Sequence, residues 1–409
     1  MLEELGNERR IHYSLDRFQE ALKSLGHPER TVSALMVAGT NGKGTTSLLL
    51  SSALMYAGHH VGTYLSPHLQ SPTERFLENM QPIPSDEFCS LALEYESAAR
   101  EFNLTYFEYL ALLNFVWAKE KKFDFMVLEV GLGGRLDATN VTWPVASIIT
   151  NIALDHQQYL GHTLTEILYE KLGIVHPSGL LFTGIDDKDL LEQLFRRCEA
   201  LDAIYYLSKE IPRSRSDISF DGQKAKIGPI TCDLSNPTRG TLENAALALL
   251  VLRIIFPKIP LATIQKAFSA VATPGRMEVV SSNPRIVLSG DHNPAGIRCL
   301  LETLETLKPE KLRTLCAFSP DKPYLEMFEA LNDVSDEIIL TEIGRYKGQM
   351  PKDYYSIEPF VEDPRAALRT LEQRTQPGEL LLVTGSLYLV GELRPIWRKE
   401  VRFLKETGK

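Results

Sequence analysis

The sequence predicts an α/β protein of two domains, each built on a mainly parallel β-sheet. A chain of 409 residues is longer than one ordinary hydrophobic core accommodates. From about residue 30 onward, apolar runs alternate with amphipathic stretches, which is typical of the strands and helices of a parallel sheet. The segment ATPGRME interrupts this alternation with a Pro-Gly pair. We therefore expect an N-terminal domain at residues 1–271, a linker at residues 272–276 and a smaller C-terminal domain at residues 277–409.

Each apolar run predicts one element. A first strand is expected at residues 32–40, and the helix behind it at residues 44–58. Further strands of the N-terminal domain are expected at residues 59–66, 123–131, 146–154 and 179–185. Helices are expected at residues 105–122 and 261–271, and a short β excursion at residues 214–234. After the linker we expect strands at residues 285–291, 312–318, 336–344 and 378–386, with helical patterns such as 295–307 and 363–375 between them.

Composition narrows the class of partner. Hydrophobic residues make up 44% and charged residues 24% of the chain, and no apolar run is long enough to cross a membrane. The formal net charge of -9 argues against nucleic acid as the main partner, because no basic stripe offsets it. The polar N-terminus does not resemble a signal peptide, so we expect a cytoplasmic protein. The five cysteines are widely scattered and predict neither disulfides nor a cysteine metal site.

A glycine-rich loop between the first strand and its helix predicts a phosphate site. The segment VAGTNGKGTTSLLL lets backbone N–H groups point inward, and the following helix adds positive potential at its N-terminus. Its lysine can reach outer phosphates, although the spacing departs from the general P-loop pattern. The alternative is a plain tight turn. We expect nucleotide contacts from Gly39, Thr40, Asn41, Gly42, Lys43, Gly44, Thr45 and Thr46.

Polar residues at three strand ends predict a shared site beside this loop. Glu129 ends one expected strand, Ser66 another and His156 a third. Ligands gather at the carboxyl ends of parallel strands, and a nucleotide-bound divalent cation needs hard oxygen ligands. Taken alone, Glu129 is equally well explained as a buried acid paired with Arg135. The other two residues favour the shared site.

Other polar residues near these motifs carry less information. On its helix, Lys171 is explained by the residues alone as an exposed side chain or a partner of Glu170. The remaining histidines of these segments are expected at turns or on the surface, namely His59, His60, His68 and His162.

Ten motifs together resemble the folylpolyglutamate synthase and dihydrofolate synthase family, a branch of the Mur-type ligases. In chain order they are GTNGKGTT, YLSPHL, ERF, EVGLGGRLDATN, ALDH, LGHT, EKLGI, TPGRMEVV, HNP and TGSLYLVGE. The resemblance runs from residue 39 to about residue 392, and EVGLGGRLDATN is highly specific to the family. It implies an N-terminal P-loop ATPase domain, a Rossmann-like C-terminal domain and an active site in the cleft between them. Members of the family are commonly monomers.

The resemblance also implies roles for individual residues. Two Mg²⁺ ions are implied, one bound by Ser66, Glu129 and His156 and the other supported by Lys171 as a carbamate. Lys171 matches the lysine of the family's EKAGI motif, in which Leu172 replaces the usual alanine. Asn244 and Arg276 match nucleotide-contacting residues, and the pterin of dihydropteroate is implied to contact Thr105, Phe107, Asp137 and Ala138.

One motif departs from the family pattern. Where relatives read DGAHNP, this chain has Ser289, Gly290 and Asp291 before HNP. The nucleotide-contacting acid is thus replaced by Ser289. Asp291 lies two positions further along an extended segment and faces the same side, so it can substitute for the missing acid. Weakened nucleotide binding is the alternative.

The implied reaction is ATP-dependent amide formation. ATP would phosphorylate the carboxylate of dihydropteroate or a folate such as tetrahydrofolate, and the α-amine of L-glutamate would displace the phosphate. Domain closure would bring His292 and Arg276 to the phosphates and exclude water, with Lys43 and Lys171 completing the catalytic group. The alternatives are a Mur-type amide ligase with a cell-wall substrate and a degenerate nucleotide-binding protein.

Overall fold

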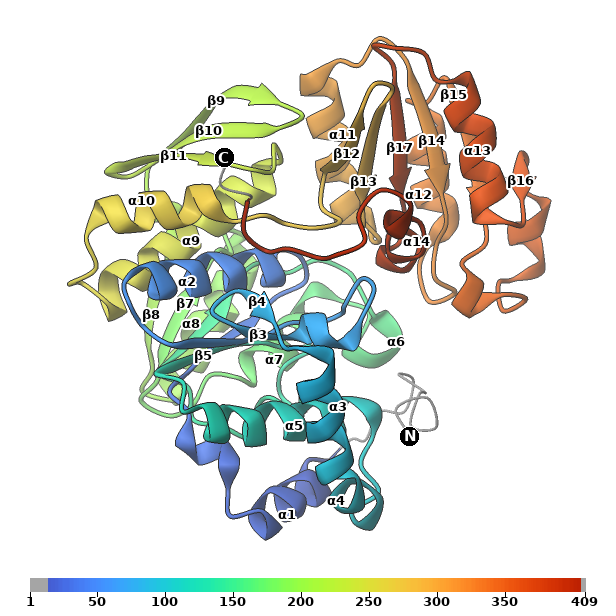
Figure 1. Ribbon diagram of the computed structural model, residues 1–409. Helices are drawn as coiled ribbons and strands as arrows, with labels where there is room; N and C mark the ends of the chain where they lie inside the picture. The colour runs from blue at the N-terminus through green and yellow to red at the C-terminus, as the bar shows by residue number, and fades with distance from the viewer. Residues whose placement is uncertain (1–13, 406–409) are drawn as a thin grey trace.

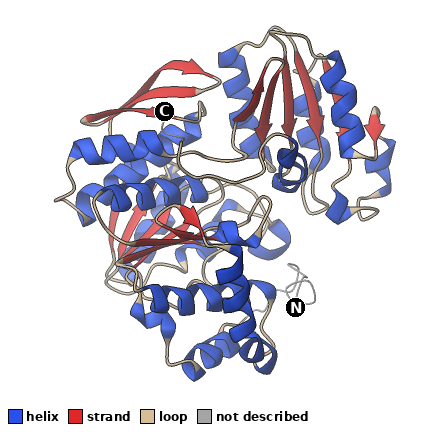
Figure 2. Ribbon diagram, viewed as in Figure 1, coloured by secondary structure: helices blue, strands red, loops and turns tan. Residues whose placement is uncertain are grey.

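The computed structural model describes residues 14–405, which form two α/β units (Figure 1). Residues 1–13 and 406–409, the outer ends of the two predicted domains, lie outside the described residues. Within the described range, no helix is both long and apolar enough to cross a lipid bilayer. The predicted α/β class is confirmed, since helices flank both large sheets (Figure 2).

The N-terminal unit is built on a sheet with strand order β4-β3-β2-β5-β1-β6-β7-β8. Its strands are β1 Ala34–Ala38, β2 Val61–Tyr64, β3 Phe76–Glu78, β4 Gln81–Pro82, β5 Phe125–Glu129, β6 Ala146–Ile149, β7 Leu180–Thr183 and β8 Ile204–Leu207. The neighbouring strands β2, β5, β1, β6, β7 and β8 are all parallel. At the edge next to β2, strands β3 and β4 are added in antiparallel orientation. The carboxyl ends of β1, β2, β5 and β6 therefore meet at one edge, as the sequence predicts.

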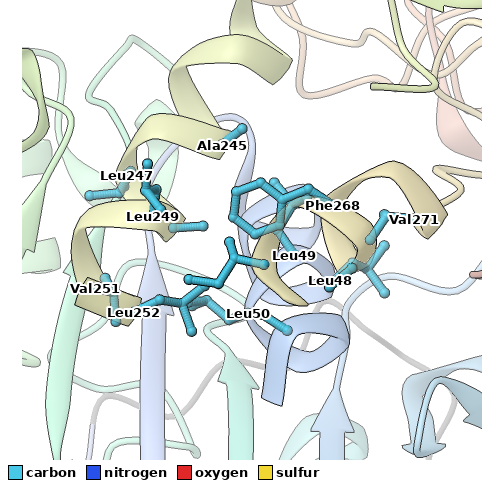
Figure 3. Packing of buried hydrophobic residues seen from close by; sticks show 14 of the residues in the cluster. Leu48, Leu49, Leu50, Ala245, Leu247, Leu249, Val251, Leu252, Phe268 and Val271 are labelled. Atoms are coloured by element: carbon cyan, nitrogen blue, oxygen red, sulfur yellow. The ribbon is translucent and has the colours of Figure 1, made fainter. Parts of the chain in front are cut away.

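Helices cover both faces of this sheet because its strands are apolar on both sides. Leu35 and Val37 of β1 face one side, and Met36 and Ala38 face the other. The first face packs against α2 Lys43–Tyr56 and α9 Arg239–Ile255, with α10 Leu261–Ala270 alongside. Their apolar side chains meet in Figure 3. The remaining helices of the unit are α1 Asp16–Ser24, α3 Ser85–Glu94, α4 Glu96–Glu101, α5 Tyr106–Lys121, α6 Gln157–Leu160, α7 Leu164–Leu172 and α8 Lys188–Ala200.

A small antiparallel sheet lies on α10, where the sequence predicts a β excursion. It consists of β9 Arg213–Ser219, β10 Gly222–Ile227 and β11 Ile230–Leu234. Short 3-10 helices complete the chain at η1 Pro28–Thr31, η2 Pro72–Arg75, η3 Ser208–Glu210, η4 Gly344–Tyr346, η5 Lys352–Ser356 and η6 Arg394–Ile396.

The C-terminal unit is built on a second sheet with order β12-β13-β17-β14-β15-β16. Its strands are β12 Glu278–Ser282, β13 Arg285–Ser289, β14 Leu312–Cys316, β15 Glu337–Thr341, β16 Phe360–Val361 and β17 Leu380–Thr384. Only β12 is antiparallel to its neighbour among the described strands of this sheet. One face packs against α11 Pro294–Leu307 and α12 Tyr324–Asn332, and the other against α13 Pro364–Arg374 and α14 Leu387–Leu393.

The chain crosses between the units twice, once at the expected linker and once near its C-terminus (Figure 1). Val271 forms an isolated bridge with Leu404, and the N–H of Ala272 donates to Phe403 O at 2.9 Å. Val401 and Phe403 belong to the hydrophobic core of the N-terminal unit. The boundary at residues 272–276 stays a prediction. The structure adds that residues 401–405, within the range predicted for the C-terminal domain, pack on the N-terminal unit.

Candidate active site

The phosphate loop at residues 39–44 connects β1 to α2 and depends on glycine for its shape. Gly42 is the N-cap residue of α2 and has φ 82°, a left-handed conformation that favours glycine. A Cβ atom at Gly42 would lie 2.4 Å from the side-chain amide of Asn244 on α9. The loop thus passes directly against Asn244, the residue predicted to contact nucleotide.

The two residues that follow β6 hold the same loop through hydrogen bonds. The carbonyl of Asn41 accepts hydrogen bonds from Thr150 Oγ1 at 2.6 Å and Asn151 Nδ2 at 2.8 Å. Lys43 Nζ donates to the carbonyls of Gly39 and Thr40, both at 3.2 Å. Burial lowers the pKa of Lys43, and the carboxylates of Glu129 and Asp155 oppose that shift. The lysine is therefore held inside the loop as a desolvated donor.

A cavity of about 460 Å³ opens between this loop and the C-terminal unit. Residues from both units border it, which is where the resemblance places an active site. The predicted residues that line the cavity are Gly39, Thr40, Asn41, Gly42, Lys43, Gly44, Thr45, Ser66, Glu129, His156, Lys171, Asn244, Arg276, Ser289, Asp291 and His292. Thr46 is fully buried beneath the loop and does not line the cavity.

The three strand-end residues face the cavity together. The N–H of Ser66 donates to Glu129 Oε2 at 2.9 Å, which joins the ends of β2 and β5. Burial raises the pKa of Glu129, and Lys43 opposes that shift. Burial lowers the pKa of His156 to about 4, so its imidazole is neutral at neutral pH and able to bind a metal. The alternative partner of Glu129 is not used, because Arg135 pairs with Glu170 at 2.9 Å.

Lys171 is buried, so neither explanation from the residues alone describes it. Its side chain is 3% exposed, and Nζ donates to Gly39 O at 3.0 Å. Burial lowers its pKa to about 7, and Lys43 acts in the same direction. The lowered pKa favours the uncharged amine, which is the form that reacts with CO₂.

The C-terminal unit supplies the opposite wall of the cavity. Arg276 Nη1 donates to Gly290 O at 2.8 Å, and Ser289 Oγ donates to Asp291 Oδ2 at 2.6 Å. Burial raises the pKa of Asp291, and Arg276 opposes that shift. Burial lowers the pKa of His292 to about 3. The carboxylate at position 291 thus reaches the side chain at position 289, where the resemblance places the family's acid.

The residues predicted to bind the pterin do not line this cavity. Thr105 caps α5 by accepting from the N–H of Glu108. Phe107 and Ala138 pack against a hydrophobic core, and the guanidinium of Arg75 lies 5.5 Å from the ring centre of Phe107. Their role in binding stays a prediction.

Asp137 is occupied by its own loop. Its Oδ2 accepts from the N–H groups of Gly131 and Leu132, and its Oδ1 accepts from the N–H and hydroxyl of Thr139. The carboxylate holds the shape of the glycine-rich segment whose residues Gly131 and Leu132 line the cavity.

The sequence interpretation did not assign roles to three residues at the interface of the units. Lys322 forms a buried ion pair with Asp155, and Asn293 bonds to both Asn41 and Asp155. Asp155 and Asn293 lie inside the quoted motifs ALDH and HNP, but Lys322 lies in a segment without a recognised motif. His68 is also more than a turn residue, because it is half-buried and accepts from Arg75 Nε at 2.9 Å.

Comparisons with known proteins now decide the family. The Mur ligase middle domain matches residues 37–252, and the Mur ligase glutamate ligase domain matches residues 275–387. The dihydrofolate synthase/folylpolyglutamate synthase of Bacillus subtilis is 30% identical over 405 residues, covering 93% of this chain and 94% of the relative. The chain belongs to the folylpolyglutamate synthase and dihydrofolate synthase family. The family predicted from the motifs is confirmed.

Solved structures of this family share the fold of the whole chain. A Mycobacterium tuberculosis folylpolyglutamate synthase complexed with ADP has a TM-score of 0.89 at 26% identity and covers 98% of both chains. An FPGS–AMPPCP–folate complex has a TM-score of 0.85 at 26% identity, covering 97% of this chain and 98% of the other. The chain therefore shares its two-unit architecture with these solved synthases.

Proposed function

We propose that this synthase is an ATP-dependent amide ligase that adds L-glutamate to dihydropteroate or to folates such as tetrahydrofolate. The observation that carries the proposal is the convergence of Lys43, Glu129, His156 and Lys171 on one cavity bordered by both units. Relatives named dihydrofolate synthase/folylpolyglutamate synthase, and family structures with an ATP analogue and folate, support the reaction.

We propose that Mg²⁺ binds beside the phosphate loop, held by Ser66, Glu129 and His156. Among residues 14–405, no three His, Cys, Asp or Glu side chains come together as a metal cluster. That is compatible with Mg²⁺, which is usually held by one or two carboxylates together with substrate phosphates. The buried carboxylate of Glu129 provides such a ligand next to the phosphate loop. When bound, Mg²⁺ would neutralise charge developing on the phosphoryl oxygens.

The chain's own residues then position the reactants. Lys43 and the N–H groups of the phosphate loop hold the outer phosphates in line with the acceptor carboxylate, which becomes an acyl phosphate. Arg276 and His292 on the opposite wall exclude water from this intermediate. The α-amine of glutamate attacks the activated carbon, phosphate leaves, and an amide forms.

We propose that Lys171 acts as a carbamate. The uncharged amine attacks CO₂ and releases one proton, which leaves an anionic group in place of a cation. Its position below Gly39, 3.0 Å from the carbonyl oxygen, allows that anion to support a second Mg²⁺ near the loop. The amine's lowered pKa favours the reaction.

We propose that Asp291 replaces the family's nucleotide-contacting acid and that the acceptor's pterin lies near Thr105, Phe107, Asp137 and Ala138. Asp291 and Ser289 both line the cavity and are hydrogen-bonded to each other. Gly131 and Leu132 line the cavity, and their N–H groups donate to Asp137, so this pterin residue lies next to the cavity lining. The ligase would act as a monomer, because one chain supplies both walls. Its cytoplasmic location stays a prediction.

ADP release measured with dihydropteroate and with tetrahydrofolate, each with and without glutamate, tests the function. We expect glutamate-dependent ADP release with at least one acceptor. Activity with a muramyl acceptor in place of both would assign the chain to cell-wall synthesis. ATP binding without any glutamate-dependent ADP release would identify a degenerate nucleotide-binding protein.

A further inference from the structure

The phosphate loop bonds directly to the C-terminal unit through one pair of asparagines. Asn293 Nδ2 donates to Asn41 Oδ1 at 2.9 Å, and Asn41 Nδ2 donates back to Asn293 Oδ1 at 3.2 Å. Asn41 is part of the loop, whereas Asn293 is the N-cap residue of α11 in the other unit. These bonds join a loop of one unit to a helix terminus of the other.

The side chain of Asn293 has no spare hydrogen-bonding capacity. Its second N–H donates to Asp155 Oδ2 at 2.9 Å, and its oxygen also accepts from the N–H of Gly296 at 2.8 Å. Both amide hydrogens and both lone pairs are therefore used. Asn293 is 1% exposed, so an unmatched polar atom here could not turn to solvent.

An ion pair reinforces the same junction. Lys322, which follows β14, reaches across the interface and bonds to Asp155 Oδ1. Lys322 and Asp155 are each 8% exposed. Asp155, in the N-terminal unit, thus accepts hydrogen bonds from a lysine and an asparagine of the C-terminal unit. The same asparagine also contacts the phosphate loop. Without Asp155, the buried ammonium of Lys322 would keep only Asp321, at 3.4 Å, as an acidic neighbour, so loss of the pair should weaken the junction.

We propose that Asn41, Asp155, Asn293 and Lys322 form a latch that makes docking of the C-terminal unit depend on the conformation of the phosphate loop. Thr150 and Asn151 hold the backbone carbonyl of Asn41, so the position of its side chain depends on the conformation of the loop. Asp291 and His292 immediately precede Asn293 in the chain and line the cavity. The latch residues Asn293 and Lys322 are positioning residues, because they hold those cavity residues against the loop.

The kinetic consequence rests on the proposed ligase function, but the structural consequence does not. If docking and loop conformation are one equilibrium, loss of the latch should loosen residues 39–44 in the unliganded chain. In the working enzyme, it should also admit water to the acyl phosphate, so that ATP is consumed without an amide product.

The deciding variant is Asn293→Ser in the full chain. Serine keeps an oxygen that can cap α11 but is too short to reach Asn41 and Asp155. We expect amide hydrogen exchange in residues 39–44 to become about tenfold faster without any ligand. We expect kcat to fall about 10- to 100-fold, with a larger ratio of ADP released to amide formed than in the wild type.

Asn41→Ala tests the latch from the other unit and guards against misfolding of the first variant. It should speed amide hydrogen exchange at the N-terminus of α11, a helix that is far from Asn41 in the sequence and contacts it through Asn293. Asn41→Ala combined with Asn293→Ser should be no worse than Asn293→Ser alone, because Asn293→Ser already removes the bonds that Asn41→Ala breaks. Asp363→Ser is the matched control, since it changes the N-cap residue of α13, away from the interface, and should leave exchange and kcat unchanged.

Wild-type exchange in residues 39–44 together with a wild-type ADP-to-amide ratio in Asn293→Ser would overturn the latch. Additive effects of the two asparagine changes would overturn it as well. Absence of glutamate-dependent ADP release in the wild type would instead remove the proposed function, and the exchange experiment would still decide the latch.

Discussion

The two halves of the predicted site differ in how their polar side chains are used. Lys43, Glu129 and His156 face a cavity and carry charge or metal-binding capacity into it. The side-chain oxygens of Thr105 and Asp137 instead accept hydrogen bonds from nearby backbone N–H groups. Thr105 caps a helix, and Asp137 lies at the centre of a turn. The first set was predicted from the glycine-rich loop and the strand ends, whereas binding roles for Thr105 and Asp137 were implied only by the family resemblance.

This difference shows that a motif can specify a binding group or the scaffold that holds one. The distinction depends on where each hydrogen bond goes. A carboxylate that accepts four N–H or O–H groups has filled its lone pairs, so its replacement affects shape before it affects binding. A buried carboxylate that points into a cavity affects chemistry first. Substitutions at the two kinds of residue should therefore differ in whether turnover or stability changes first.

The largest effect is expected from Glu129→Gln. The amide keeps an oxygen that can accept from the N–H of Ser66 but loses the charge proposed to hold Mg²⁺. We expect turnover to fall about 100-fold or more. The melting temperature should stay the same or rise, because burial disfavours the charged carboxylate in the fold. ADP release and thermal unfolding measure the two effects.

Glu78→Gln is the control for that change. Glu78 ends β3 and pairs with His60 and Lys121 away from the cavity, so turnover should be unchanged. Near-wild-type turnover of Glu129→Gln would remove Glu129 from the metal site and move it into the class of scaffold residues.

A smaller effect is expected where this chain departs from the family motif. Asp291→Ala should raise the KM for ATP about tenfold, the cost of one hydrogen bond to a charged acceptor. Adding Ser289→Asp to Asp291→Ala restores the DGAHNP pattern and should recover most of the lost affinity. Steady-state kinetics at saturating acceptor would measure both. A double variant as weak as Asp291→Ala would show that the two positions are not equivalent.

The sequence predicted those parts of the site that depend on local pattern and sheet order. Glycine spacing identified the phosphate loop, and the meeting of parallel strand ends brought Ser66 and Glu129 together. It did not predict Lys322, whose partner Asp155 is 167 positions earlier and becomes adjacent only when the units dock. The same applies to residues 401–405, whose return to the N-terminal unit has no local signal.

For Lys171, the local sequence pattern predicts the wrong environment. Its helix pattern predicts an exposed lysine or an ion pair with Glu170, yet Glu170 pairs with Arg135 and Lys171 is buried beneath the phosphate loop. Only the EKLGI motif pointed to the role proposed for it, because packing of α7 under the loop is a tertiary property.

Asp137→Asn should act mainly on stability. An amide can accept from only one of the two donor groups, so its NH₂ would face the N–H of Gly131 and Leu132 or those of Thr139. We expect the free energy of unfolding to fall by about 1–3 kcal/mol. The KM for dihydropteroate should rise as the loop distorts. Unchanged melting behaviour with a large rise in that KM would place Asp137 with the residues that bind directly.

The smallest effect, expected from Phe107→Ala, tests the acceptor side without disturbing a hydrogen bond. The ring is partly exposed and packs at the edge of a core, and the guanidinium of Arg75 lies near one face. Loss of one aromatic stacking surface costs about 0.5–1.5 kcal/mol, so the KM for dihydropteroate should rise about two- to tenfold while the KM for ATP stays constant. Phe107→Tyr keeps the ring and should preserve both values. Equal changes in the two KM values would mean that Phe107 supports the whole site, and the pterin would then have to bind elsewhere.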